Sequence, residues 1–185
     1  KGAATIVTAD YRAPFLAHAT MEPMACTAKV EGGRAEVWTG VQDPLNARST
    51  AAKALDIDVE QVTLTNLLLG GGFGRRLPFT FDYVELAVLV AQAMSPLPVK
   101  TIWSRENDIQ HDYYRGAAMS RHAGALDAQG VPLAAHSVYT GGGNSEAVSM
   151  PYAIAGKDAD EKTAKHHVRP GQWRSVLNSQ HGFFK

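Results

Sequence analysis

Alternation of apolar and polar residues predicts two β-hairpins in this chain. Residues 25–30 and 34–41 alternate on either side of a Glu-Gly-Gly turn, and strand residues flanking such a turn indicate a hairpin. Residues 115–126 and 131–140 form a second pair, joined by the turn sequence Asp-Ala-Gln-Gly. The two hairpins favour sheets with antiparallel neighbours.

Other segments are shorter or less regular. Residues 5–8 are β-branched and predict a short edge strand, while 59–69 and 99–103 predict two further strands. Residues 104–108 are polar and are expected to form a turn, and the highly charged stretch 156–167 is expected to be an exposed loop.

A first helix is predicted from Pro44 to about Asp56. Asp43 is a good N-cap, and proline is well tolerated at the first helical position. Leu45, Ala52 and Leu55 give this helix a sparse apolar face.

A second helix is predicted after Asp82, which together with Glu85 resembles a capping box, and it ends before Pro96. Its expected core face consists of Leu86, Leu89, Val90, Ala93 and Met94. Strands outnumber helices and occur partly as hairpins, so the fold class is α+β, with mixed or antiparallel sheets and a few packed helices. We expect one domain over 1–185, with a sub-boundary near 141–170.

Composition narrows the function classes. The chain has 185 residues, 45% of them apolar, and 18 basic residues balance 18 acidic ones, which argues against binding of nucleic acid or a membrane surface through bulk charge. The single cysteine, Cys26, excludes an internal disulfide and a cysteine-ligated iron–sulfur cluster, and we expect it in the core.

The seven histidines have no metal-ligand spacing, so no protein-ligated metal is predicted, and His18, four residues before Glu22, is interpreted as structural. The first residue is not methionine, and we expect a piece of a longer protein whose compartment cannot be deduced from missing targeting signals.

The segment Gly70–Arg76, which we call the glycine loop, is the strongest candidate for ligand binding. It reads Gly-Gly-Gly-Phe-Gly-Arg-Arg, lacks the Lys-Ser or Lys-Thr of a P-loop, and has the wrong spacing for a dinucleotide fingerprint. Either it is a turn without a ligand, or its backbone N–H groups form an anion cradle. Consecutive glycines lose much conformational entropy on folding, which favours close approach of a ligand.

Four further stretches accompany this loop in order: Leu16–Pro23, Val41–Pro44, Trp103–Asp108 and Trp173–Val176. The ordered set resembles the molybdopterin-binding large subunit of the xanthine dehydrogenase/aldehyde oxidase family. The two arginines after Phe-Gly, and Trp-Arg-Ser-Val at 173–176, are similar to the isoquinoline 1-oxidoreductase beta-subunit type, which is also seen in membrane-associated bacterial aldehyde dehydrogenases.

The resemblance implies an activity and partners. Such enzymes hydroxylate a carbon of an N-heterocycle, or oxidise an aldehyde, with oxygen from water. Their cofactor is molybdopterin, in some members as the cytosine dinucleotide, and the pterin rather than protein side chains holds the metal. A small subunit with two [2Fe–2S] clusters accepts the electrons, in some cases with a cytochrome, and the subgroup is often periplasmic. The alternative is a non-catalytic domain that binds a nucleotide or anion through the glycine loop.

The resemblance also implies roles for particular residues. Gln42 matches the glutamine that hydrogen-bonds an oxygen ligand of molybdenum, and Arg174 matches the arginine that faces the substrate; these are the two candidate catalytic residues. Phe73 would flank the metal. Either Arg75 or Arg76 would reach cofactor phosphate, or pair with an acid such as Asp82. The candidate cofactor-binding residues are Gln42, Gly71, Gly72, Phe73, Gly74, Arg75, Gln172, Trp173 and Arg174.

Departures from the family pattern limit the expected activity. Leu77 stands where purine-oxidising relatives carry a glutamate, so purine hydroxylation is not expected. The family's catalytic base is a glutamate of the C-terminal half, which is not in this chain. We therefore expect these 185 residues alone to be inactive.

Overall fold

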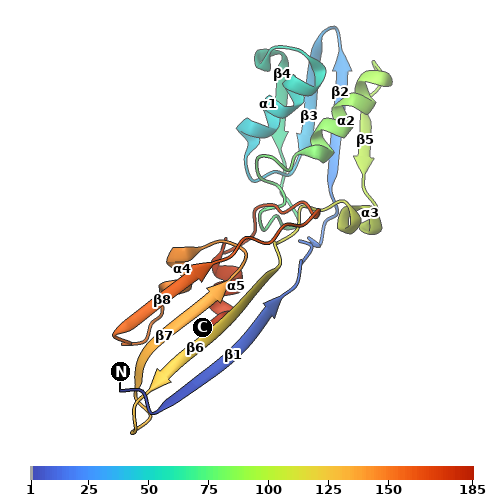
Figure 1. Cartoon of the computed structure of the whole chain (residues 1–185). Coiled ribbons are helices and arrows are strands. Elements are labelled where there is room, and N and C mark those ends of the chain that lie inside the picture. Colours follow the sequence, from blue (N-terminus) through green and yellow to red (C-terminus); the bar gives the residue numbers. More distant parts are fainter. Residues whose placement is uncertain (1) are drawn as a thin grey trace. The chain divides into compact units, whose positions relative to one another are not determined.

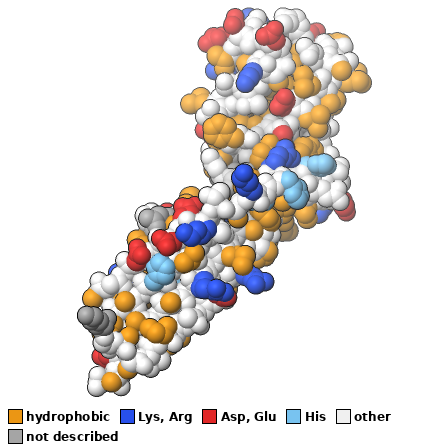
Figure 2. All heavy atoms as spheres, viewed as in Figure 1, with side chains coloured by type: hydrophobic (Ala, Val, Ile, Leu, Met, Phe, Trp, Pro, Cys, Tyr) orange, Lys and Arg blue, Asp and Glu red, His pale blue; other side chains and the backbone are white. Residues whose placement is uncertain are grey.

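The computed structural model describes residues 2–185 and divides into two compact units (Figure 1). The first unit consists of the chain up to Leu16, Arg115–Val168 and Trp173–Lys185. The second consists of Ala17–Tyr114 and Arg169–Gln172. One of the points where the chain passes between units, after Val168, lies within the interval 141–170. Hydrophobic side chains are visible on the surface of both units (Figure 2).

The second unit is a four-stranded mixed sheet with helices on one face (Figure 1). Its elements are β2 (Ala25–Glu31), β3 (Arg34–Thr39), α1 (Pro44–Leu55), a 3-10 turn (Val59–Gln61), β4 (Val62–Asn66), α2 (Asp82–Ala93), β5 (Val99–Ile102) and α3 (Arg105–Gln110). The strand order is β4-β3-β2-β5, with β3 and β4 parallel and the other pairs antiparallel. The predicted hairpin of β2 and β3 is confirmed. Fully buried side chains of the sheet and α2, among them Val37, Val62, Val84 and Val88, form the core.

Helix α1 begins where the sequence predicts. The Asp43 side chain accepts a hydrogen bond from the Asn46 N–H at 3.0 Å, and Pro44 is the first helical residue. The predicted face is partly wrong, because Leu45 is exposed and the buried face is Ala47, Ala51, Ala52 and Leu55. Small residues on this face let the helix lie close to the sheet.

Helix α2 also begins as predicted, but its cap and its buried face differ. The N-cap is Phe81, and the Asp82 carboxylate accepts a hydrogen bond from Arg75 instead of closing a capping box. The buried face is Tyr83, Val84, Ala87, Val88 and Ala91, whereas Leu86, Leu89, Val90, Ala93 and Met94 are exposed. Apolar residues surround this helix, so the helical period fitted two faces and did not identify the buried one.

The first unit is a sheet of order β1-β6-β7-β8 with two short helices. Its elements are β1 (Thr5–Ala13), β6 (Ala118–Leu126), β7 (Pro132–Tyr139), α4 (Asn144–Val148), β8 (Gly156–Glu161) and α5 (Asn178–Phe184). The predicted edge strand is present in β1 but is longer than expected. The hairpin of β6 and β7 is confirmed, and Asp127 Oδ1 in its turn accepts from the N–H groups of Gln129 and Val131 at 2.8 and 2.9 Å. Ala13, Ala118 and Phe184 form a small core.

Two predicted irregular segments are regular, so these predictions were wrong. The expected turn at 104–108 opens helix α3, because the Ser104 hydroxyl accepts from the Asn107 N–H at 3.2 Å as an N-cap. The expected loop at 156–167 begins with β8, which pairs in parallel with β7 at the sheet edge. Its side chains are mostly exposed, so the strand has no apolar alternation to reveal it.

Burial makes Cys26 unreactive. The side chain is enclosed in the core, and desolvation raises the thiol pKa from 9.0 to about 12, against the lowering effect of the hydrogen bond with Thr39. The thiolate is the reactive form, and its population near pH 8 falls about 10³-fold for a pKa shift of this size. We expect iodoacetamide to leave Cys26 unmodified in the native protein and to modify it after unfolding in urea, as measured by mass spectrometry. Rapid native-state labelling would show that the core opens.

Among residues 2–185 as described, no helix has the length and apolar content needed to cross a membrane.

Candidate functional site

The glycine loop connects β4 to α2 in the second unit and has an alternating backbone. Gly71, Phe73 and Gly74 have φ angles of 101°, 55° and 109°, whereas Gly72 between them does not have a positive φ. Positive φ is unusual for phenylalanine, which places Phe73 in a strained conformation with its ring 43% exposed. The sign of φ alternates only from Gly70 to Phe73, and residues alternating in this way turn successive N–H groups toward one concave side.

The N–H groups of this loop fall into two sets, those that donate within the protein and those that do not. The flanking ones are used internally, because the Gly70 N–H donates to Glu22 Oε2 at 2.8 Å and the Gly74 N–H donates to Gln42 Oε1 at 3.1 Å. The N–H groups of Gly71, Gly72 and Phe73 have no acceptor within the described part of the chain. The arrangement fits a group that presents oxygen acceptors, such as the oxygen ligands or phosphate of a cofactor.

Gln42 is attached to the same loop. Its backbone N–H donates to the Arg76 carbonyl at 2.9 Å, and its Oε1 accepts from Gly74, so the side-chain amide is fixed by its oxygen. The amide nitrogen then retains two donors for an external acceptor. A Cβ on Gly72 would lie 2.3 Å from Gln42 Oε1, so glycine is needed there for the side chain to occupy this place.

Arg76 and Glu22 support the glycine loop through side-chain contacts. The Arg76 side chain is fully buried, and it donates to the carbonyls of Gly71 and Gly40 and to that of Glu22, each at 3.0 Å. It also pairs with Glu22 Oε2 at 2.9 Å. A Cβ on Gly70 would meet Glu22 Cβ at 2.5 Å. Glu22 therefore packs directly on the loop and neutralises the arginine beneath it.

Arg75 is directed into the protein. Its side chain is 1% exposed, donates to Asp82 Oδ1 at 3.0 Å and to the Thr80 carbonyl at 2.6 Å, and places Nε 3.0 Å from Asp112 Oδ1 in an ion pair without hydrogen-bond alignment. Burial raises the pKa of Asp82, and the neighbouring Arg75 charge opposes that shift. Of the two alternatives for Arg75, these contacts favour pairing with Asp82 over contact with a phosphate.

Asp112 joins Arg75 to His18. The Asp112 carboxylate accepts from the His18 backbone N–H and lies 3.0 Å from His18 Nδ1. The other ring nitrogen, Nε2, lies 2.8 Å from the Gln172 carbonyl oxygen. Residues 18, 75, 112 and 172 are thus connected through buried polar contacts within the second unit.

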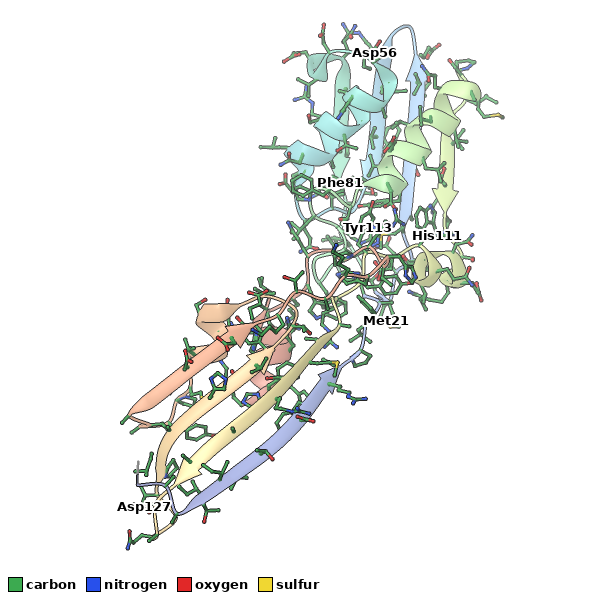
Figure 3. The ribbon with its side chains drawn as sticks, in the orientation of Figure 1. Met21, Asp56, Phe81, His111, Tyr113 and Asp127 are labelled. Carbon is green, nitrogen blue, oxygen red and sulfur yellow. The ribbon has the colours of Figure 1, made fainter. Side chains whose placement is uncertain are left out.

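The segment Arg169–Gln172 carries the predicted site residue Gln172. The Tyr114 N–H donates to the Arg169 carbonyl and the Gly171 N–H donates to the Tyr114 carbonyl, both at 3.0 Å. The Arg169 guanidinium lies 4.6 Å from the Tyr113 ring centroid, and Figure 3 labels this ring. The Gln172 side chain is exposed.

Trp173 and Arg174 belong to the first unit. The Arg115 guanidinium lies 5.9 Å from the centre of the Trp173 ring, and Arg174 is exposed. The next two residues, Ser175 and Val176, have φ angles of 71° and 50°. Positive φ is costly for a β-branched residue, and backbone strain of this kind is enriched at functional loops.

The structure thus brings together Gln42 and the glycine loop, and it places Gln172 in the same unit. Sequence reasoning named Arg76 and placed His18 and Glu22 in the Leu16–Pro23 stretch, but it did not identify them as supports of the site, and it missed Asp112. Several of their contacts join residues far apart in the chain, from 48 positions for Glu22 with Gly70 to 154 for His18 with Gln172, so no local spacing identifies these contacts.

Metal-binding groups and pockets are two further features to compare with the predicted site. Among the described residues, no group of three or more His, Cys, Asp or Glu side chains is arranged to hold a metal ion. A pocket of about 560 Å³ in the second unit is lined by Asp82, Leu86, Thr101, Ile102, Trp103, Asn107, His111 and Arg169. This pocket contains none of the predicted site residues.

Comparison with known proteins identifies one matching family and several similar proteins. Residues 1–158 match the family described as molybdopterin cofactor-binding domain. The chain is 36% identical over 124 residues to a membrane-bound aldehyde dehydrogenase [pyrroloquinoline-quinone] of Gluconacetobacter polyoxogenes, covering 67% of this chain and 16% of that protein. It is 35% identical over 118 residues to isoquinoline 1-oxidoreductase subunit beta of Brevundimonas diminuta, covering 63% and 15%. The fold is similar to quinoline 2-oxidoreductase from Pseudomonas putida 86, with a TM-score of 0.77 and 19% identity over 94% of this chain and 24% of that one.

Proposed function

The chain belongs to the molybdopterin cofactor-binding domain family, and we propose that the intact protein is a molybdenum hydroxylase. Its reaction would be hydroxylation of an N-heterocycle, or oxidation of an aldehyde, with oxygen from water. The names of the relatives from Brevundimonas and Gluconacetobacter support these two substrate classes. Family membership does not favour a non-catalytic nucleotide-binding or anion-binding domain. The chain spans about a sixth of its curated relatives, so activity is proposed for the whole protein only.

The three N–H groups of Gly71, Gly72 and Phe73, which have no acceptor in the described chain, are the observation that carries the proposal. When bound, the cofactor supplies a molybdenum centre that accepts two electrons from the substrate. The loop would hold oxygen ligands of that group with fixed N–H donors, which need no reorganisation during the reaction. Phe73, half-exposed on this loop, would exclude water beside the metal.

Gln42 would donate a hydrogen bond from its amide nitrogen to an oxygen ligand of the metal. The contact of its Oε1 with the Gly74 N–H supports this role, because it fixes which end of the amide faces outward. Arg174 would stabilise negative charge that develops on the substrate, with Trp173 and Gln172 beside it in the chain. Arg75 is assigned to holding the loop through Asp82 and Asp112.

The proposal extends to the partners of the intact protein. The word subunit in the name of the Brevundimonas relative supports a multi-subunit enzyme. We propose that the electrons taken from the substrate pass to a small subunit with two [2Fe–2S] clusters. The cytosine dinucleotide form of molybdopterin is the proposed cofactor. The base that activates water is not assigned to any residue of this chain.

Metal analysis tests the proposal. The intact protein, expressed in a host that makes the molybdenum cofactor, is expected to contain about one molybdenum per chain by mass spectrometry. Pyrroloquinoline quinone, which the name of the Gluconacetobacter relative mentions, is measured in the same sample after extraction. Protein that contains the quinone and no molybdenum would contradict the proposal.

Replacing Gln42 by alanine is expected to lower kcat of the intact enzyme about 10²-fold, the usual effect of removing one donor to a developing oxyanion. Molybdenum content and the unfolding midpoint should be nearly unchanged, since Gln42 is exposed. The matched control is Gln129→Ala, a change at another exposed glutamine in the β6–β7 turn. Equal activity of both variants would remove Gln42 from the site.

A further inference from the structure

We propose that His18 is a positioning residue that holds the segment Arg169–Gln172, and with it Gln172, against the part of the second unit that carries the glycine loop. The inference rests on the proposed function, because it concerns the placement of a proposed cofactor-binding residue. It gives a role at the site to His18, which the sequence placed in the Leu16–Pro23 stretch and which was interpreted only as structural.

The buried position of His18 is the first observation. The side chain is 1% exposed and its two ring nitrogens have different partners, Asp112 on one side and the Gln172 carbonyl on the other. A carbonyl oxygen only accepts, so Nε2 carries a proton and donates to it across 2.8 Å. The bond joins residues 154 positions apart in the sequence.

The orientation of the ring is fixed from the opposite side. Asp112 lies 3.0 and 3.1 Å from His18 Nδ1 with its two carboxylate oxygens, and it also accepts from the His18 backbone N–H. With both main chain and ring tied to one carboxylate, the ring points Nε2 at a defined place. The same carboxylate faces Arg75 of the glycine loop at 3.0 Å, so the loop and the Gln172 carbonyl share one buried anchor.

The remaining contacts of the segment show what His18 adds. Arg169 and Gly171 are paired with Tyr114, and Gly171 packs so closely on Tyr113 that a Cβ would lie 2.5 Å from Tyr113 Cβ. These contacts hold the beginning of the segment. At its end, the bond from His18 Nε2 holds the Gln172 carbonyl, directly before Trp173 and Arg174. Loss of this bond would free Gln172 while leaving Arg169 in place.

The test compares two side chains of equal length. In His18→Gln, the amide at the ε position can still donate to the Gln172 carbonyl, whereas in His18→Met it cannot. Hydrogen–deuterium exchange of the intact, molybdenum-free protein is followed for the peptide that covers 169–176. We expect the wild-type segment to be protected, exchange to be about tenfold faster in His18→Met, and His18→Gln to restore at least half of the protection on a logarithmic scale.

Equal exchange in the two variants, or an unprotected segment in the wild-type protein, would overturn the inference. The wild-type measurement needs no variant, so an unprotected segment would overturn the inference even if both substitutions prevent folding. In the loaded enzyme, His18→Met should lower kcat while His18→Gln retains more of it. Because the exchange readout needs no molybdenum, failure of the proposed function leaves it interpretable.

Discussion

Replacing Arg76 by methionine is expected to destabilise the protein by about 3 kcal/mol or more, because three carbonyl groups around this fully buried side chain would lose a donor, at roughly 1 kcal/mol or more each. Methionine retains much of the packing volume under the Tyr83 ring, which the Arg76 guanidinium approaches to 5.8 Å. It supplies no donor, however. The carbonyls of Gly71, Gly40 and Glu22 and the Glu22 carboxylate would then lose hydrogen bonds of 2.9 to 3.0 Å.

The measurement is urea unfolding of the intact protein, followed by circular dichroism and by exchange of the glycine-loop peptide. Arg121→Met is the matched control, because Arg121 makes a similar pair with Asp10 on an exposed strand face and should leave the midpoint nearly unchanged. Arg76→Lys should fall between wild type and Arg76→Met, since an ammonium keeps the charge but its three donors sit on one nitrogen and cannot reproduce the planar fork of a guanidinium. A midpoint for Arg76→Met equal to that of the control would show that Arg76 is not the support of the loop.

Much of the fold was predictable because it rests on short-range patterns. The Gly-containing turns between β2 and β3 and between β6 and β7 were read correctly, and so was the start of α1 at Asp43-Pro44. The buried face of α2 was not, because apolar residues lie on several sides and the sheet selected the smaller ones. Strand β8 was missed because it is an edge strand with exposed charged residues, and its pairing with β7 is a tertiary contact.

Part of the candidate site could also be predicted from the sequence and part could not. The glycine loop was visible in the sequence because its composition is locally unusual, and Gln42 was found only through the resemblance of the ordered motifs. The side chains that support the loop and Gln42 could not be identified as supports from the sequence. Glu22 reaches Arg76 across 54 residues and His18 reaches Asp112 across 94, and ordinary residue types at such separations have no spacing rule. The sequence left the roles of Arg75 and Arg76 open between contact with a phosphate and an ion pair within the protein. Both side chains are fully buried, which favours the ion pair.

Replacing Asp112 by alanine is the second change with a large expected effect, again about 3–5 kcal/mol of lost stability. The carboxylate is 2% exposed, accepts from the backbone N–H groups of His18 and Tyr113, and lies 3.0 Å from both Arg75 Nε and His18 Nδ1. Its removal leaves Arg75 with Asp82 as the remaining carboxylate partner, and Asp82 is 26% exposed.

The variant Asp112→Asn separates charge from hydrogen bonding at this position. Asparagine keeps one oxygen acceptor for the N–H groups but loses the charge that faces Arg75, so it should destabilise less than alanine and more than the exposed control Asp10→Ala. Chemical unfolding measures the order of the three. If Asp112→Asn is as stable as wild type, the buried charge of Asp112 is unimportant and Asp82 alone balances Arg75. If Asp112→Asn and Asp112→Ala are equally unstable, the charge is the dominant contribution, and the glycine loop is held electrostatically through the pairing of Asp112 with Arg75.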